Sequence, residues 1–165
     1  MITDWKELAE RLGLIHNDGE SGGDRYAEQA LQEILGEEWI LQTVEHILSY
    51  KKGSEIAMNC LRLIRSKKAA TLAYQIYKSS SNDRADRAVW LIKHLEHPIA
   101  ITWVEEFLDD DNVKHWGLGV LDELLWHELV PYDDYTKALL EKSENVSPEQ
   151  VQFIREYLAE RDLNK

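Results

Sequence analysis

The chain has 165 residues, of which 44% are hydrophobic and 30% are charged. This balance is typical of one folded domain and excludes wholesale disorder. Its 31 acidic residues outnumber the 19 lysines and arginines, which gives a formal net charge of −12. Such a charge disfavours a general binder of phosphate backbones, because that function needs a positive field.

The start of the chain and its cysteine content indicate a compartment. The first residues carry acids and no apolar run, so we expect no signal peptide. No apolar stretch approaches the ~20 residues that a membrane span requires, and no membrane partner is expected. The single cysteine, Cys60, excludes an internal disulfide and favours a reducing compartment. We expect a cytoplasmic protein in which Cys60 is a buried structural thiol.

The predicted elements are helices along the whole chain. Apolar residues recur at helical spacing, and neither strict alternation nor a two-residue hairpin turn indicates a strand. Pro131 ends one helix and places a new start near Tyr132–Asp134. Other helix-start signals are Ser54, Asn82-Asp83 and Ser147-Pro148-Glu149. The sequence therefore predicts an all-α fold.

A short block recurs along the chain, each time followed by a second apolar helix. The blocks are Ala30–Ile34, Cys60–Ile64, Ala88–Ile92 and Gly117–Leu121, so their first positions are 30, 28 and 29 residues apart. A period near 30 residues with two helices per unit is typical of an α-solenoid. Each block begins with a small residue, which is expected where neighbouring helices approach closely.

The paired-helix period, with Pro98 opening the second helix of the third unit, resembles HEAT-like repeats over residues 23–142. The resemblance implies a single domain built as a short HEAT-like α-α solenoid, a superhelix of antiparallel helix pairs. Its units would be residues 23–53, 54–82, 83–111 and 112–142, with flanking helices at 1–14 and 148–163. A plain irregular helical bundle is the alternative.

Charge is distributed in blocks along the sequence. Residues 1–50 carry a net charge of −8, residues 51–100 of +6, and residues 101–165 of −10. Similar helical-repeat architectures, including alkylpurine glycosylases, act on DNA, and the basic middle would suit that reading. Two of the three segments are acidic, however, and no aromatic residues interleave with the basic ones, so we expect no nucleic-acid partner. The alternative interpretation is that these charge blocks are ordinary solvent-exposed helix faces.

Two sequence patterns resemble metal sites and fail the tests for them. His94 and His97 flank Glu96, but their spacing is wrong for a zinc-protease helix and no third ligand is indicated. The run Asp109–Asn112 resembles the start of a calcium loop, but Lys114 and Val120 occupy the positions of the required glycine and glutamate. We expect no metal: the histidines would lie at a helix C-terminus, and the acidic run would be an inter-repeat turn.

No pattern indicates catalysis. The only glycine-rich stretch, Gly19–Gly23, matches no phosphate-binding loop and is expected to be a mobile connection. No Ser-His-Asp or Cys-His arrangement is indicated locally, although a triad assembled from distant positions stays open. We therefore expect no enzyme activity and no cofactor.

Six tryptophans are many for this length, and they fall into two kinds of surroundings. Trp90 and Trp103 lie on apolar stripes and are expected in the core. Trp116 and Trp126 lie among acidic residues, where they would suit an interface with a basic protein, because tryptophan is a frequent anchor residue and charges steer the encounter. Core packing is the alternative for this second pair.

An acidic one-domain solenoid of this size is similar to the small helical-repeat immunity proteins of contact-dependent inhibition and related bacterial toxin systems. That resemblance implies a protein partner, namely a basic, nuclease-type toxin whose cationic cleft the chain occludes stoichiometrically. A HEAT-like scaffold or a chaperone or lyase-type adaptor is the first alternative. An enzyme or a DNA-binding helical-repeat protein is the second.

We expect the partner site in the acidic C-terminal part of the chain. Glu105 and Glu106 align with Glu45-His46 and Tyr74-Gln75 of the preceding second helices, which predicts one common ridge of the kind that solenoids offer to partners. The predicted site comprises Glu105, Glu106, Asp109, Asp110, Trp116, Asp122, Glu123, Trp126, Asp133 and Asp134.

Overall fold

The computed structural model describes residues 3–16, 19–20 and 23–163. Regular structure in these residues is helical, apart from one antiparallel pairing of two residues each, between β1 (Ile15–His16) and β2 (Gly19–Glu20). The predicted all-α fold is confirmed. Strands of two residues are too short to produce an alternating pattern, so this pairing could not be predicted from the sequence. Of the expected glycine-rich connection, Ser21 and Gly22 lie outside the described residues.

The described α-helices are between 6 and 25 residues long. They are α1 (Trp5–Arg11), α2 (Asp24–Leu48), α3 (Ser54–Leu63), α4 (Lys67–Ser79), α5 (Asn82–Leu95), α6 (Val104–Asp109), α7 (Lys114–Trp126), α8 (Asp134–Ser143) and α9 (Pro148–Leu163). A 3-10 helix, η1 (Pro98–Trp103), leads directly into α6. Each of these helices is too short or too polar to cross a membrane.

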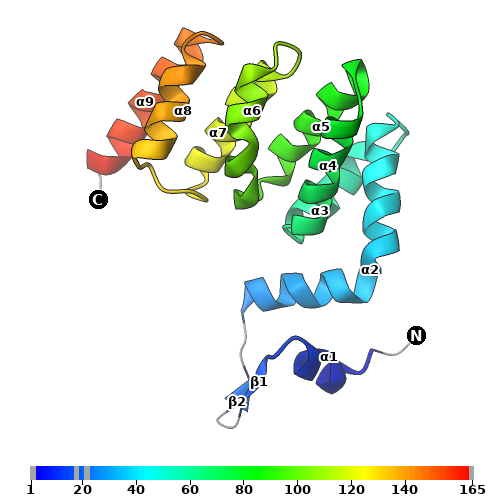
Figure 1. Ribbon diagram of the computed structural model, residues 1–165. Helices are drawn as coiled ribbons and strands as arrows, with labels where there is room; N and C mark the ends of the chain where they lie inside the picture. The colour runs from blue at the N-terminus through cyan, green and yellow to red at the C-terminus, as the bar shows by residue number, and fades with distance from the viewer. Residues whose placement is uncertain (1–2, 17–18, 21–22, 164–165) are drawn as a thin grey trace.

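From α3 onward the helices form antiparallel pairs that stack beside one another (Figure 1). One layer contains α4, α6 and α8, and the other contains α3, α5, α7 and α9. The core lies between the layers and includes the fully buried Phe107, Leu121 and Ile154. Because neighbours in the chain are neighbours in space, each unit buries its apolar face against the next unit.

Proline and capping residues set several helix starts. Pro98 occupies the first turn of η1, as predicted. The α8 start predicted after Pro131 is also confirmed, because Asp133 and Thr136 form a capping box there. The predicted starts at Ser54 and Asn82 are displaced by one residue, since the N-cap positions are Gly53 and Ser81.

Gly36 bends α2 into two arms. Its φ of 79° and ψ of 164° are not helical, and this region is accessible almost only to glycine. The arm after Gly36 packs against α3, α4 and α5, whereas the arm before Gly36 lies at a steep angle to that second arm (Figure 1). The side chain of Gln32 in that first arm donates to the Ile64 carbonyl at the end of α3, over 3.0 Å.

Cys60 is exposed, so its predicted burial is wrong. A complete antiparallel helix pair comes directly before α5 and before α7, whereas α3 directly follows the bent helix α2. One side of α3 therefore stays open, and Ile56 and Leu63 are exposed there as well. The expected close approach is found at Gly117, where an added Cβ would lie 2.8 Å from the Cβ of Phe107.

Candidate functional site

The ten residues of the predicted partner site do not form one surface. Glu105, Glu106, Asp109 and Asp110 belong to α6 or its C-cap, in the layer of α4 and α8. Trp116, Asp122, Glu123 and Trp126 belong to α7, in the layer of α5 and α9. Asp133 and Asp134 are exposed at the start of α8, where Asp133 is the N-cap.

The acids of α6 are largely paired with lysines of neighbouring units. Glu105 and Asp109 lie 3.4 and 2.7 Å from the ammonium group of Lys142 on α8, and the hydrogen bond with Asp109 raises the pKa of Lys142. Glu106 accepts hydrogen bonds from Lys78 and Tyr74 on α4. These contacts reduce the negative field of α6 and connect the second helices of successive units.

Asp110 has a structural role in the turn after α6. Its carboxylate accepts hydrogen bonds from the Tyr77 hydroxyl at 3.1 Å and from the Asn112 backbone N–H at 2.9 Å. The Asp110 carbonyl accepts from the N–H groups of Val113 and Lys114 at the start of α7. The acidic run is thus an inter-repeat turn, as expected.

Trp116 is half-buried, and its indole N–H donates to Asp86 of α5 over 2.8 Å. Trp116 also packs against the core, which agrees with the core-packing alternative, and its role in partner binding stays a prediction. Trp90 and Trp103 are half-buried against the core, as their apolar stripes predicted. The ring of Trp103 stacks on that of Tyr74, with centroids 4.4 Å apart.

Trp126 lies on the surface with two aromatic side chains of α9. Trp126 and Phe153 are 54% and 57% exposed. Their rings lie edge-on to the ring of Tyr157, at centroid distances of 4.8 and 5.8 Å. Phe153 and Tyr157 are four residues apart on α9 and so project from the same face. We call these three residues the aromatic surface.

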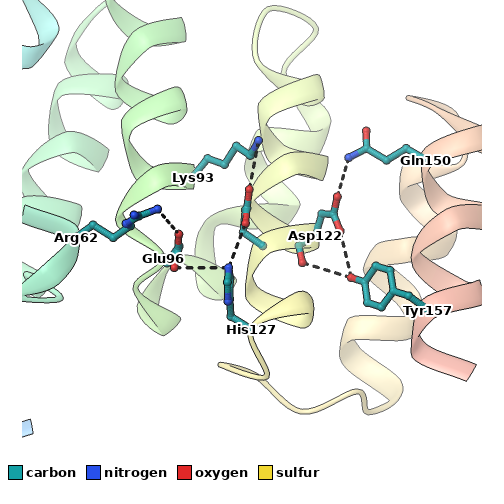
Figure 2. A network of polar contacts seen from close by, with 8 residues as sticks. Arg62, Lys93, Glu96, Asp122, His127, Gln150 and Tyr157 are labelled. Atoms are coloured by element: carbon teal, nitrogen blue, oxygen red, sulfur yellow. Dashed lines mark hydrogen bonds and ion pairs between the residues drawn. The ribbon is translucent and has the colours of Figure 1, made fainter. Parts of the chain in front are cut away.

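Asp122 places a negative charge at the edge of the aromatic surface. Its carboxylate accepts hydrogen bonds from the Tyr157 hydroxyl at 3.1 Å and from the Gln150 amide at 3.0 Å (Figure 2). Both donors are neutral, so these two hydrogen bonds bring no positive charge to Asp122. Burial, followed by the Asp122 charge, raises the pKa of Tyr157 above its ordinary value.

Glu123 belongs to a second polar network on the same layer (Figure 2). It lies 3.5 Å from Lys93 of α5 and 3.6 Å from His127, one turn further along α7. His127 also approaches Glu96, the C-cap of α5, which in turn accepts a hydrogen bond from Arg62 of α3. This network joins three successive helices of the layer.

His94 and His97 have separate environments. The ring of His94 lies edge-on to that of Trp90. Nδ1 of His97 accepts a hydrogen bond from the Ile99 N–H and caps η1. Burial is the main cause that lowers the pKa of both histidines. The charge of Lys93 lowers the pKa of His94 further, and the charge of Lys67 lowers that of His97 further.

A pocket of about 1200 Å³ occupies the inner corner of the bent α2. This pocket could not be predicted from the sequence, because it depends on the bend at Gly36. Its lining mixes apolar side chains such as Leu41 and Leu72 with charged ones such as Lys67 and Glu37. Lys68 and Glu37 pair with each other there over 2.5 Å.

Comparison of the chain with protein-family models, with curated protein sequences and with solved structures finds no match.

Proposed function

We propose that this chain is a protein-binding module that acts as an immunity protein and neutralises a basic, nuclease-type bacterial toxin by stoichiometric binding. The observation that carries the proposal is the aromatic surface, where Trp126 and Phe153 are both more than half exposed and both contact Tyr157. Clustered exposed aromatic side chains are typical of protein interfaces, in which they anchor the partner.

The charge of the chain supports a basic partner. The acidic residue Asp122 lies beside the aromatic surface and is bonded there to neutral donors, and the chain as a whole carries a formal net charge of −12. A nuclease needs a cationic cleft to hold phosphate groups, and an acidic protein is attracted to such a cleft from a distance. Occlusion of the cleft would then suffice for inhibition, with no chemistry by this chain.

The ion pairs of α6 reduce the set of residues that we assign to the partner site. Glu105, Glu106 and Asp109 already contact lysines of this chain, so a partner would have to compete with those contacts. Trp126 and Asp122 instead contact the neutral side chains of Tyr157 and Gln150. The proposed partner site is therefore the aromatic surface together with Asp122, and the acids of α6 mainly hold successive units together.

Co-expression tests the function. We expect the gene immediately upstream to encode a secreted protein with a toxic C-terminal domain, and that domain is expressed in a sensitive host with or without the chain. We expect the wild-type chain to restore growth and Trp126→Ala to restore it less well. The matched control is Trp5→Ala, which removes a tryptophan that is 64% exposed on α1, far from the site in sequence.

Failure of the wild-type chain to protect would contradict the immunity function. Equal protection by the wild type and Trp126→Ala, at toxin levels where protection is partial, would contradict the assignment of Trp126 to the partner site.

A further inference from the structure

Glu96, Glu123 and His127 bring three metal-ligating side chains together, and neither the proposed function nor the sequence patterns considered above use this set. Glu123 lies in the last turn of α7 and His127, four residues later, is the C-cap of that helix, so the two side chains lie on one side of the helix end. Glu96 reaches the same point from the neighbouring helix, because it caps the C-terminus of α5 with a left-handed backbone (φ 50°) that turns the chain toward α7.

The distances between the possible ligand atoms suit a small divalent ion. Nε2 of His127 lies 3.6 Å from Oε2 of Glu123 and 3.8 Å from Oε2 of Glu96. One ligand atom from each of the three residues lies within 4.8 Å of the other two. Tetrahedral ligands at the zinc bond lengths of about 2.0–2.2 Å lie about 3.3–3.6 Å from one another, so small side-chain movements would bring these atoms to the separations that zinc requires.

The second oxygen of each carboxylate is held by a cation of the same chain. Arg62 donates to Oε1 of Glu96 at 3.3 Å, and Lys93 lies 3.5 Å from Oε1 of Glu123 (Figure 2). Both carboxylates therefore direct their remaining oxygen, Oε2, toward His127. Outer contacts of this kind orient the ligands of protein metal sites. They also balance the two carboxylate charges, so they limit the affinity of the set for a cation.

We propose that Glu96, Glu123 and His127 bind a divalent transition-metal ion of the Zn²⁺ type. One nitrogen and two oxygen ligands are a donor set that zinc accepts, with water in the fourth position. The His127 side chain is 43% exposed, which gives the ion and its water access from solvent. The ion would connect the end of α5 with the last turn of α7 and so join two successive units of the array.

Isothermal titration of the tag-free, chelator-treated full chain with Zn²⁺ tests the proposal. We expect one equivalent to bind to the wild type, and His127→Ala and Glu123→Gln each to weaken binding at least tenfold. The matched control is His115→Ala. That exposed histidine lies on the same helix, 3.8 Å from the carboxylate of Asp86, and the set of three excludes it, so its loss should leave zinc binding unchanged.

Thermal unfolding provides a second readout. Zinc should raise the melting temperature of the wild type and of His115→Ala, since an ion that binds the folded chain stabilises it, and it should leave that of His127→Ala unchanged. The proposal is overturned if the wild type binds zinc no more tightly than His127→Ala does, or if His115→Ala loses binding to the same extent. Circular dichroism without metal shows whether each variant is folded.

Discussion

The hydroxyl of Tyr74 donates a 2.6 Å hydrogen bond to the carboxylate of Glu106, across 32 residues of sequence and between the second helices of successive units. This bond, with burial and the Glu106 charge, raises the pKa of Tyr74 to about 12. Burial opposes the ionisation of Glu106, but hydrogen bonds from Lys78 and Tyr74 outweigh it and hold the pKa of Glu106 below its ordinary value.

This pairing predicts a loss of stability in alkali. Because the pKa of Tyr74 is raised in the folded state, its contribution to the free energy of unfolding is complete below pH 10 and is lost as the pH rises from 10 to about 12. Tyr74→Phe should therefore lose less stability than the wild type over that interval. Urea unfolding at a series of pH values measures the difference.

The control for this prediction is Tyr135→Phe, which removes an exposed phenol whose hydroxyl lies 3.5 Å from a backbone carbonyl. A wild-type chain whose stability follows that of Tyr74→Phe up to pH 12 would contradict the proposed pairing.

Two adjacent aspartates should differ in their effect on stability. Asp110→Ala removes the acceptor of the Tyr77 hydroxyl and of the Asn112 N–H, and we expect a loss of about 1–3 kcal/mol in the free energy of unfolding. Asp109→Ala removes only a surface ion pair with Lys142, so its loss should stay within about 0.5 kcal/mol. Equal losses in chemical denaturation would show that Asp110 has no special structural role.

Two glycines of α7 provide a matched test of the packing between units. Gly117→Ala would place a methyl group 2.8 Å from the Cβ of Phe107 and 3.2 Å from the backbone of Leu108, and we expect it to destabilise the fold by about 1–3 kcal/mol. Gly119→Ala would meet only the flexible side chain of Lys93, at 3.1 Å. Since alanine favours a helix by about 1 kcal/mol, this variant should be neutral or slightly more stable. Thermal unfolding compares the two.

The period of the helix pairs and the proline-marked helix starts could be predicted from the sequence, because both depend on residues close together in the chain. The bend of α2 could not. The apolar pattern continues through Gly36, and only the backbone conformation of that residue separates the two arms. The exposure of Cys60 follows from the same feature, since burial of a repeat position depends on the helix that precedes it.

The candidate site was predictable only in part. Trp126 and Asp122 were among the predicted residues, but Phe153 and Tyr157 lie in α9, which belongs to none of the aligned units. The separation of four residues between Glu123 and His127 could have indicated a metal-ligating pair at the end of one helix. The approach of Glu96 was not, because it depends on how α5 and α7 pack.

Removal of the Asp122 charge should affect the rate of association with a basic partner. Asp122→Asn keeps one acceptor oxygen for the Tyr157 hydroxyl. The Gln150 amide, which donates to the other oxygen in the wild type, can turn so that its own oxygen accepts from the new NH2 group, so the fold should persist. We expect a several-fold lower association rate at low salt and little difference at high salt, since salt screens the steering field. Stopped-flow measurements with the partner toxin domain show whether the difference disappears with salt. A difference that persists at high salt would instead indicate a direct contact.

Surface plasmon resonance of Trp126→Ala against the partner toxin domain is the most direct test of the proposed partner site. If Trp126 anchors the partner, its removal should raise the dissociation rate by about thirtyfold, which corresponds to about 2 kcal/mol of binding free energy. Trp5→Ala should dissociate as the wild type does, and circular dichroism should show that both variants are folded. Dissociation of Trp126→Ala at the wild-type rate would contradict the central claim that the partner binds at the aromatic surface.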